Sequence, residues 1–237
     1  MVRGAAALLA VALGALAYFL VAPSLPAFGS LDTAIVVGAS VGLAFIVAIA
    51  ALPGAAVVAP FTLVPAVVGS VLLVAVLDAT RAGAAASPFE ALFFACVGVA
   101  FAAVLDAPGL AVALPLFVGA LDLTGLVGTT PGGLLVQDAA RPGDPFTVEL
   151  PGWGGGLPAA RVTGAEIVFL AAYVAYAHLF GLRPRASAVA MYAALVAVVV
   201  LGVVFDRRVP ALTLTSAAYL AVNADRLAAL LRSGREG

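Results

Sequence analysis

Residues 186–205 read ASAVAMYAALVAVVVLGVVF, twenty consecutive positions without a charged side chain. A helix crosses the hydrocarbon core of a bilayer in about 20 apolar residues. This stretch is therefore predicted to be a membrane-spanning helix. Outward from it, hydrophobic runs between charges and Pro/Gly breaks give eight segments of this kind. They are 4–22, 32–52, 55–77, 88–105, 109–127, 163–182, 186–205 and 210–226.

The composition of the whole chain agrees with this pattern. Of 237 residues, 65% are hydrophobic and 10% are charged, and the mean hydropathy is +1.22. A soluble domain carries about 25% charged residues, with which it covers its surface. In lipid an apolar exterior is favourable, provided that the backbone polar groups bond within helices. We therefore expect an all-α integral membrane protein of about eight transmembrane helices, with the lipid bilayer as its partner.

Charge and residue usage exclude several classes of function. The net charge is −1, and the eleven basic residues are arginines scattered along the chain, so no basic patch exists for nucleic acid. One cysteine, Cys96, and one histidine, His178, provide neither a disulfide nor a Cys/His metal cluster within one chain, and no cofactor is expected. Arginine without lysine, in a chain rich in Ala, Gly, Val and Leu, indicates a GC-rich prokaryotic genome. The expected location is the cell membrane of a prokaryote, and the oligomeric state is left open.

Several local signals refine the boundaries. The run at 4–22 resembles a secretory signal, but it is longer than the roughly 7–15 residues of a signal core, so a retained helix is expected. The sequence SPFE at 87–90 has a capping serine, a proline at the first helical position and a glutamate three residues after the cap. Pro60, Pro65 and Pro115 fall inside predicted helices, where kinks are expected.

Residues 128–162 differ from the rest of the chain. They are rich in Gly and Pro and include the one tryptophan, Trp153. Within them, FTVEL at 146–150 alternates apolar and polar residues, which is the pattern of a short strand. Loops of this length are usually functional or disordered. The sequence therefore predicts one polytopic membrane domain, residues 1–237. In its C-terminal half the loop at 128–162 separates two of the predicted helices.

Asp122 is an acidic residue inside a hydrophobic run. It stands five residues before the end of the run 109–127, about 7–8 Å below that end at 1.5 Å per residue. An ionisable side chain inside a membrane segment is costly to bury and is by default a functional hypothesis. The structural alternative is a carboxyl that stays protonated or bonds to Thr124 and a neighbouring helix.

Glu166 begins the run 163–182, in the sequence TGAE at 163–166. Thr-x-x-Glu is the capping box, which gives Glu166 a structural role. The functional alternative pairs it with Asp122, because the two residues lie on consecutive helices. Two carboxyl groups that face each other in a sheltered site share one proton, so that one activates a water and the other polarises a peptide carbonyl. The pair titrates as a unit, and the sequence assigns neither role.

A third motif, PAL at 210–212, begins the last run. An interval of 44 residues separates Asp122 from Glu166, and the same interval separates Glu166 from Pro210. Together with the strand pattern before TGAE, this order resembles the presenilin and signal peptide peptidase family of intramembrane aspartyl proteases. That family has a Tyr-Asp helix, then Gly-x-Gly-Asp opening the next helix, then Pro-Ala-Leu opening the last. The resemblance covers about residues 109–232, and residues 1–105 hold four N-terminal helices.

The resemblance implies an endopeptidase that cleaves the transmembrane helix of another protein. It implies Asp122 and Glu166 as the catalytic pair, and a strand that receives the unwound substrate by β-augmentation. The implied substrate contacts are Pro210, Ala211, Leu212, Thr147, Val148 and Glu149. The sequence departs from the family at Leu121, in place of tyrosine, and at Thr163, Gly164, Ala165 and Glu166, in place of Gly-x-Gly-Asp.

These departures leave other functions open. A glutamate is one methylene longer than an aspartate, and a displacement of about 1 Å can cost a hundredfold in rate. A degenerate homologue that keeps the fold without the reaction is therefore one alternative. A small transporter, channel or assembly scaffold is another, although a transporter is expected to show repeats and broken helices around polar residues. Polar residues are scarce in the N-terminal helices, and no repeat is evident.

Overall fold

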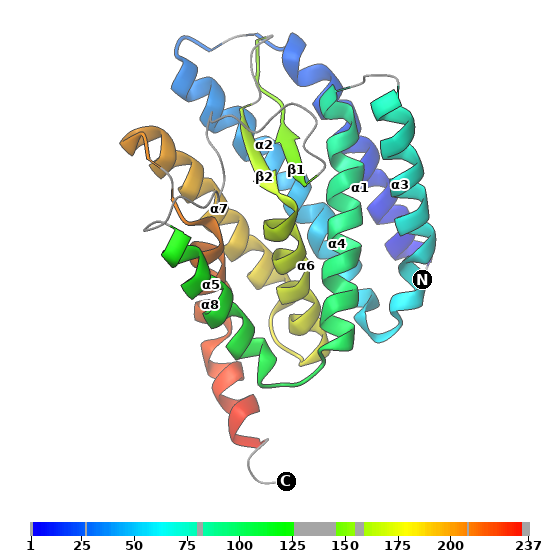
Figure 1. Ribbon diagram of the computed structural model, residues 1–237, viewed down its shortest axis with the longest axis vertical. Coiled ribbons are helices and arrows are strands. Elements are labelled where there is room, and N and C mark those ends of the chain that lie inside the picture. Colours follow the sequence, from blue (N-terminus) through cyan, green and yellow to red (C-terminus); the bar gives the residue numbers. More distant parts are fainter. Residues whose placement is uncertain are drawn as a thin grey trace.

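The computed structural model describes residues 2–26, 28–79, 83–125, 146–154, 159–207 and 209–233. In these ranges the chain forms eight α-helices, short 3-10 segments and one two-stranded sheet (Figure 1). The helices are α1 (Val2–Val21), α2 (Leu31–Ala51), α3 (Val64–Ala79), α4 (Ser87–Val104), α5 (Leu110–Gly125), α6 (Gly164–Leu179), α7 (Pro184–Phe205) and α8 (Ala211–Ser233). The strands are β1 (Thr147–Leu150) and β2 (Ala160–Thr163).

Five helical segments in the described part of the chain are long and apolar enough to cross a membrane. They are Ala6–Ser24, Leu31–Val58, Pro60–Ala79, Ser87–Val104 and Pro184–Phe205. Two shorter apolar helices are Leu110–Thr124 and Gly164–Leu179. The prediction of a helical membrane protein is thus confirmed. Of the eight predicted spans, five correspond to candidate spans in the described residues, two to shorter apolar helices, and α8 is not among either group.

The predicted helix over 55–77 is wrong in its first half. The chain instead forms 3-10 turns at Leu52–Val58 and Pro60–Leu63, and α3 begins at Val64. Proline lacks an N–H and clashes with the preceding turn, so it fits an α-helix without cost only in the first turn. Pro65 occupies such a place, as the second residue of α3, whereas Pro115 stays within α5.

The predicted serine cap of α4 is also wrong. The cap position is Ala86, and Ser87 is the first helical residue. The Ser87 hydroxyl instead accepts a hydrogen bond from the backbone N–H of Glu149, at 3.2 Å. The serine therefore connects α4 to β1, a contact between residues 62 positions apart that no local pattern predicts.

Helix α6 lies at the centre of the bundle (Figure 1). Each residue from 170 to 177 is buried, and the helix packs against α2, α4, α5, α7 and α8. Glycines allow α4 to approach it closely: a Cβ added at Gly98 would collide with the carbonyl of Val168. A Cβ added at Gly164 would come within 2.6 Å of the Phe94 ring. The helix that begins within TGAE at 163–166 is therefore close-packed and deeply buried.

The strands β1 and β2 form an antiparallel hairpin whose second strand runs directly into α6 (Figure 1). Strand β1 confirms the strand pattern of the sequence, whereas β2 was not predicted. Glu149 and Arg161 stand opposite each other and form an ion pair of 2.8 Å, a typical cross-strand contact. Beyond β1, Trp153 donates to the hydroxyl of Tyr18 at 3.0 Å and stacks on Phe28. These contacts attach the hairpin to the N-terminal helices.

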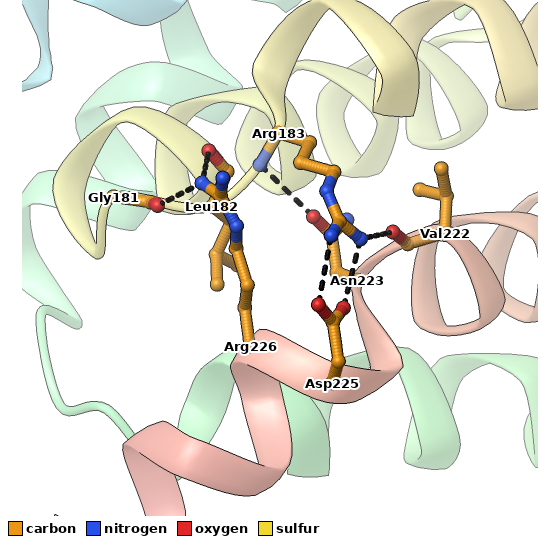
Figure 2. A network of polar contacts seen from close by, with 7 residues as sticks. All are labelled: Gly181, Leu182, Arg183, Val222, Asn223, Asp225 and Arg226. Atoms are coloured by element: carbon orange, nitrogen blue, oxygen red, sulfur yellow. Dashed lines mark hydrogen bonds and ion pairs between the residues drawn. The ribbon is translucent and has the colours of Figure 1, made fainter.

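The turn between α6 and α7 holds the middle of α8 (Figure 2). The Arg183 guanidinium donates to both carboxylate oxygens of Asp225, at 2.8 and 2.7 Å. The Arg183 backbone N–H donates to Asn223 Oδ1 at 3.0 Å. Arg183 and Arg226 together donate to three backbone carbonyls, those of Val222, Gly181 and Leu182. Helix α8 is therefore fastened to the bundle near its middle, about three turns after the PAL segment.

Candidate functional site

Asp122 contacts the first turn of α8. Its Oδ2 accepts the backbone N–H of Thr213 at 3.0 Å, and the Thr213 hydroxyl lies 3.4 Å from the same oxygen. That hydroxyl also donates to the carbonyl of Gly119, one turn earlier on α5, at 2.8 Å. Thr213 is the third residue of α8, so its N–H has no acceptor within the helix. Asp122 supplies that acceptor from a neighbouring helix.

The identity of the residue before α8 explains this contact. Pro210 precedes the helix and accepts the N–H of Leu214 through its carbonyl, but it has no side-chain oxygen with which to cap the other N–H groups. A carboxylate at a helix N-terminus is also favoured by the helix dipole. The bond to Thr124 that the sequence offered is not formed, because the Thr124 hydroxyl donates to the carbonyl of Leu121. Asp122 therefore acts as an N-cap supplied by another helix.

Glu166 forms the predicted capping box with Thr163. The Thr163 hydroxyl accepts the Glu166 N–H at 3.3 Å, and Glu166 Oε2 accepts the Thr163 N–H at 2.8 Å. The Glu166 residue is only 3% exposed, and its Oε1 has no hydrogen-bond partner within the described residues. Leaving a buried polar atom unpaired is costly. The capping box thus accounts for one carboxyl oxygen and leaves the other without a structural role.

The two carboxyl groups come from α5 and α6, two helices that pack against each other. Helix α5 packs against both α8 and α6, and Figure 1 shows α5 and α8 together at one side of the bundle. The segment at 210–212 meets Asp122 through Thr213, and its Ala211 is fully buried. The three parts that the sequence singled out therefore belong to one region, where α5, α6 and α8 meet.

The positions that depart from the family pattern differ in their surroundings. Gly164 is packed against Phe94 and has no room for a side chain. Ala165 is exposed, so its methyl group takes no space inside the bundle. Leu121, at the place of the family's tyrosine, is 53% exposed on the outside of α5. The added methyl at Ala165 and the leucine at 121 therefore do not obstruct the two acids.

Sequence reasoning missed Thr213 and the polar layer that continues from it between α6 and α8. The hydroxyls of Tyr173 and Ser216 lie 3.0 Å apart, and the Tyr173 and Tyr219 rings stack at 5.0 Å between centroids. The Tyr219 hydroxyl is buried and has no partner among the described residues. Ser216, Tyr219 and Asn223 follow helical spacing, and that periodicity is the signal from which this face could have been found.

The residues expected to bind a substrate strand are partly engaged within the protein. Val148 is buried, and Thr147 and Glu149 are half-buried. The outward-facing N–H of Glu149 already donates to Ser87 on α4. At this residue the outer edge of β1 faces the bundle and is occupied.

The fold and the site define a class: a helical membrane protein with two acidic side chains where three of its helices meet. No protein-family model, no curated protein and no solved structure matches the chain. The particular function therefore has to be argued from the residues of the chain itself.

Proposed function

We propose that this chain is a presenilin-like intramembrane aspartyl endopeptidase that uses Asp122 and Glu166 as a mixed acid pair. The observation that carries the proposal is that Asp122 bonds to the first turn of α8, which follows PAL, while its own helix packs against the helix that Glu166 begins. Three motifs spaced 44 residues apart along the chain are thereby joined in one region. An accidental resemblance to the presenilin pattern gives no reason for the helices that carry these motifs to pack together.

The chemistry of the pair suits hydrolysis of a peptide bond. One carboxylate accepts a proton from water, and one neutral carboxyl donates a proton to the peptide carbonyl. Glu166 is enclosed in the bundle, while Asp122 is half-buried on a helix at its side. A substrate helix that reaches this side would meet Asp122 first, with Glu166 behind it.

The hairpin supports a route for the substrate. A helix must unwind before it is cleaved, and an unwound segment gains hydrogen bonds by pairing with the edge of a sheet. Because Ser87 accepts the outward N–H of Glu149 on β1, we propose that the substrate pairs with β2, where the added strand replaces the bond that Glu166 Oε2 accepts from the Thr163 N–H. Strand β2 runs without interruption into Thr163 and Glu166, so a strand added there is delivered to the acid pair.

A non-catalytic homologue is the competing proposal, and one observation favours it. Each acid has a structural bond of its own: Asp122 caps α8, and Glu166 caps α6. A chain that had lost the reaction would keep both acids for these bonds alone. Such a protein would serve as a membrane scaffold rather than as an enzyme.

The test is cleavage of reporter transmembrane peptides by the purified protein in detergent and in liposomes. We expect cleavage by the wild type, and a loss of about 100-fold or more in Asp122→Asn and in Glu166→Gln, as for removal of a general acid or base. Cleavage that survives Asp122→Asn rules out the aspartyl mechanism. Absence of cleavage by the wild type across a broad peptide panel favours the scaffold.

A further inference from the structure

Folding brings together arginines that are scattered along the sequence. Arg183 and Arg185 stand on either side of Pro184, the first residue of α7. Arg226 reaches the same turn from α8, and its Nη1 donates to the carbonyls of Gly181 and Leu182 at 2.7 and 2.9 Å (Figure 2). We call the three guanidinium groups of Arg183, Arg185 and Arg226 the arginine corner.

The arginine corner lies where the chain enters the membrane. Helix α7 is one of the candidate spans, Pro184–Phe205, so Arg185 is the second residue of a span. The carbonyl of Leu182, to which Arg226 donates, precedes that span by two positions. At this depth the hydrocarbon core gives way to the lipid headgroups, and arginines near a helix end extend their charged groups towards them. The corner is therefore at the level of the lipid phosphates.

The corner carries an excess of positive charge. Arg183 is neutralised, because it forms an ion pair of 2.7 Å with Asp225. Arg226 is bonded to backbone carbonyls, which carry no net charge, and neither Arg185 nor Arg226 forms an ion pair within the described residues. Both side chains are exposed. An anion from outside the chain can therefore reach them.

The contacts of Arg226 leave part of its guanidinium available. Its Nη1 holds the carbonyls of the α6–α7 turn, whereas its Nε and Nη2 have no acceptor in the part of the chain that the structure describes. A guanidinium presents its N–H groups as a planar fork that matches the oxygens of a phosphate. Because two hydrogen bonds already orient Arg226, little side-chain freedom remains to be lost when an anion binds.

We propose that the arginine corner is a docking surface for the phosphate headgroup of an anionic phospholipid. The apolar surface beside it favours a lipid over a free phosphate ion. Val189 follows Arg185 by one helical turn on the same face of α7, and it is 67% exposed. A headgroup at Arg185 thus places an acyl chain along Val189, inside the span. The site is independent of the proposed protease activity and exists equally in a scaffold protein.

Native mass spectrometry of the purified protein, titrated with phospholipid in a neutral detergent, tests the proposal. We expect the wild type to retain phosphatidylglycerol more tightly than phosphatidylcholine. Arg185→Gln and Arg226→Gln should each weaken the binding of phosphatidylglycerol about fivefold, the usual contribution of one arginine near an anionic surface. Binding of phosphatidylcholine should be unchanged, and Arg185→Lys should bind phosphatidylglycerol more tightly than Arg185→Gln does.

Arg207→Gln is the matched control, because Arg207 is an exposed arginine just beyond the opposite end of α7. This variant should bind phosphatidylglycerol as the wild type does. Equal binding by the wild type and Arg185→Gln overturns the proposal, as does a loss of the same size in Arg207→Gln. Arg185→Gln decides the matter even if Arg226→Gln fails to fold, because the Arg185 side chain has no hydrogen bond to lose among the described residues.

Inorganic phosphate distinguishes a lipid site from a site for any anion. We expect phosphate at the concentration of the lipid to leave the bound phosphatidylglycerol in place, because it lacks the acyl chains that contact α7. Complete displacement under these conditions overturns the assignment to a lipid. None of these measurements involves cleavage, so a protein without protease activity still decides this proposal.

Discussion

The backbone N–H of Thr213 donates a 3.0 Å hydrogen bond to Oδ2 of Asp122, across 91 positions of sequence. The contact closes the N-terminal end of α8, which Pro210 leaves without a side-chain cap. It also holds the acid that we propose as one of the catalytic pair. A substitution of Asp122 is therefore expected to change both the stability of the fold and the proposed activity. Variants have to be chosen that change one of these properties without the other.

Asp122→Asn and Asp122→Ala should differ in stability while sharing a loss of activity. The asparagine amide retains an oxygen that accepts the Thr213 N–H, so folding should change little. Alanine removes the cap and should destabilise the protein by about 1 kcal/mol, the usual cost of a lost N-cap. Thermal unfolding in detergent measures this difference. Equal stability of wild type and Asp122→Ala would show that the bond to α8 contributes nothing.

Glu166→Asp separates an active pair from a decayed one. Glutamine at 166 still reaches the Thr163 N–H, so Glu166→Gln should preserve the capping box, whereas the shorter aspartate should weaken it. If the site is built around glutamate, cleavage of the reporter peptide should fall in Glu166→Asp because the carboxyl is displaced. An increase in cleavage would instead identify a decayed site that recovers with the shorter acid of the presenilin-like pattern.

Gly98→Ala should destabilise the bundle by about 1–3 kcal/mol, the usual cost of overpacking. The added methyl would collide with the Val168 carbonyl, a backbone atom that cannot rotate away. Gly69→Ala is the control, since that glycine lies on α3 with nothing within 4 Å of the added Cβ, and its stability should be unchanged or slightly higher. Similar unfolding temperatures for the two variants would contradict the close approach of α4 and α6.

Trp153 makes the attachment of the hairpin visible by fluorescence, because it is the one tryptophan in the chain. Tyr18→Phe removes the hydroxyl that accepts the indole N–H, and we expect acrylamide to quench the tryptophan more strongly. Tyr192→Phe is the control, because it removes a hydroxyl that bonds instead to the Ser40 carbonyl. Equal quenching in the two variants would mean that Tyr18 does not hold the hairpin in place.

Arg183→Ala should weaken the attachment of α8 more than Asp225→Asn does. The arginine loses its bonds to Asp225 and Val222 together, whereas the Asp225 side chain is exposed and its ion pair is screened. The hydrogen bond from Arg183 lowers the pKa of Asp225, which lies outside the five candidate spans. Its small stabilisation is therefore present above the unfolded carboxyl's pKa and is lost as the pH falls through the lowered value.

That pH effect should be absent in Asp225→Asn. Unfolding temperatures of the wild type and Asp225→Asn, measured from neutral to acidic pH, check it. If the two proteins lose stability in parallel, the ion pair makes no contribution. The buried Asn223, which accepts the Arg183 N–H, then carries the attachment of α8.

The sequence by itself determined the helical membrane class and the two acids of the candidate site. Long apolar runs leave a chain in lipid no other way to satisfy its backbone, so the helical membrane class followed from composition. The capping box at Thr163 and Glu166 was equally readable, because it joins residues three positions apart. Asp122 was identified by its charge within an apolar run. All of these signals are local or periodic.

Tertiary structure alone decided what those residues contact. Ser87 has the sequence of a cap, yet it binds Glu149, and Asp122 binds Thr213 rather than Thr124. The burial of Glu166 Oε1 depends on the helices packed around α6, and β2 exists because β1 lies beside it. These contacts join residues far apart in the chain, and they depend on the whole path of the backbone. Local sequence patterns carry no information about that path.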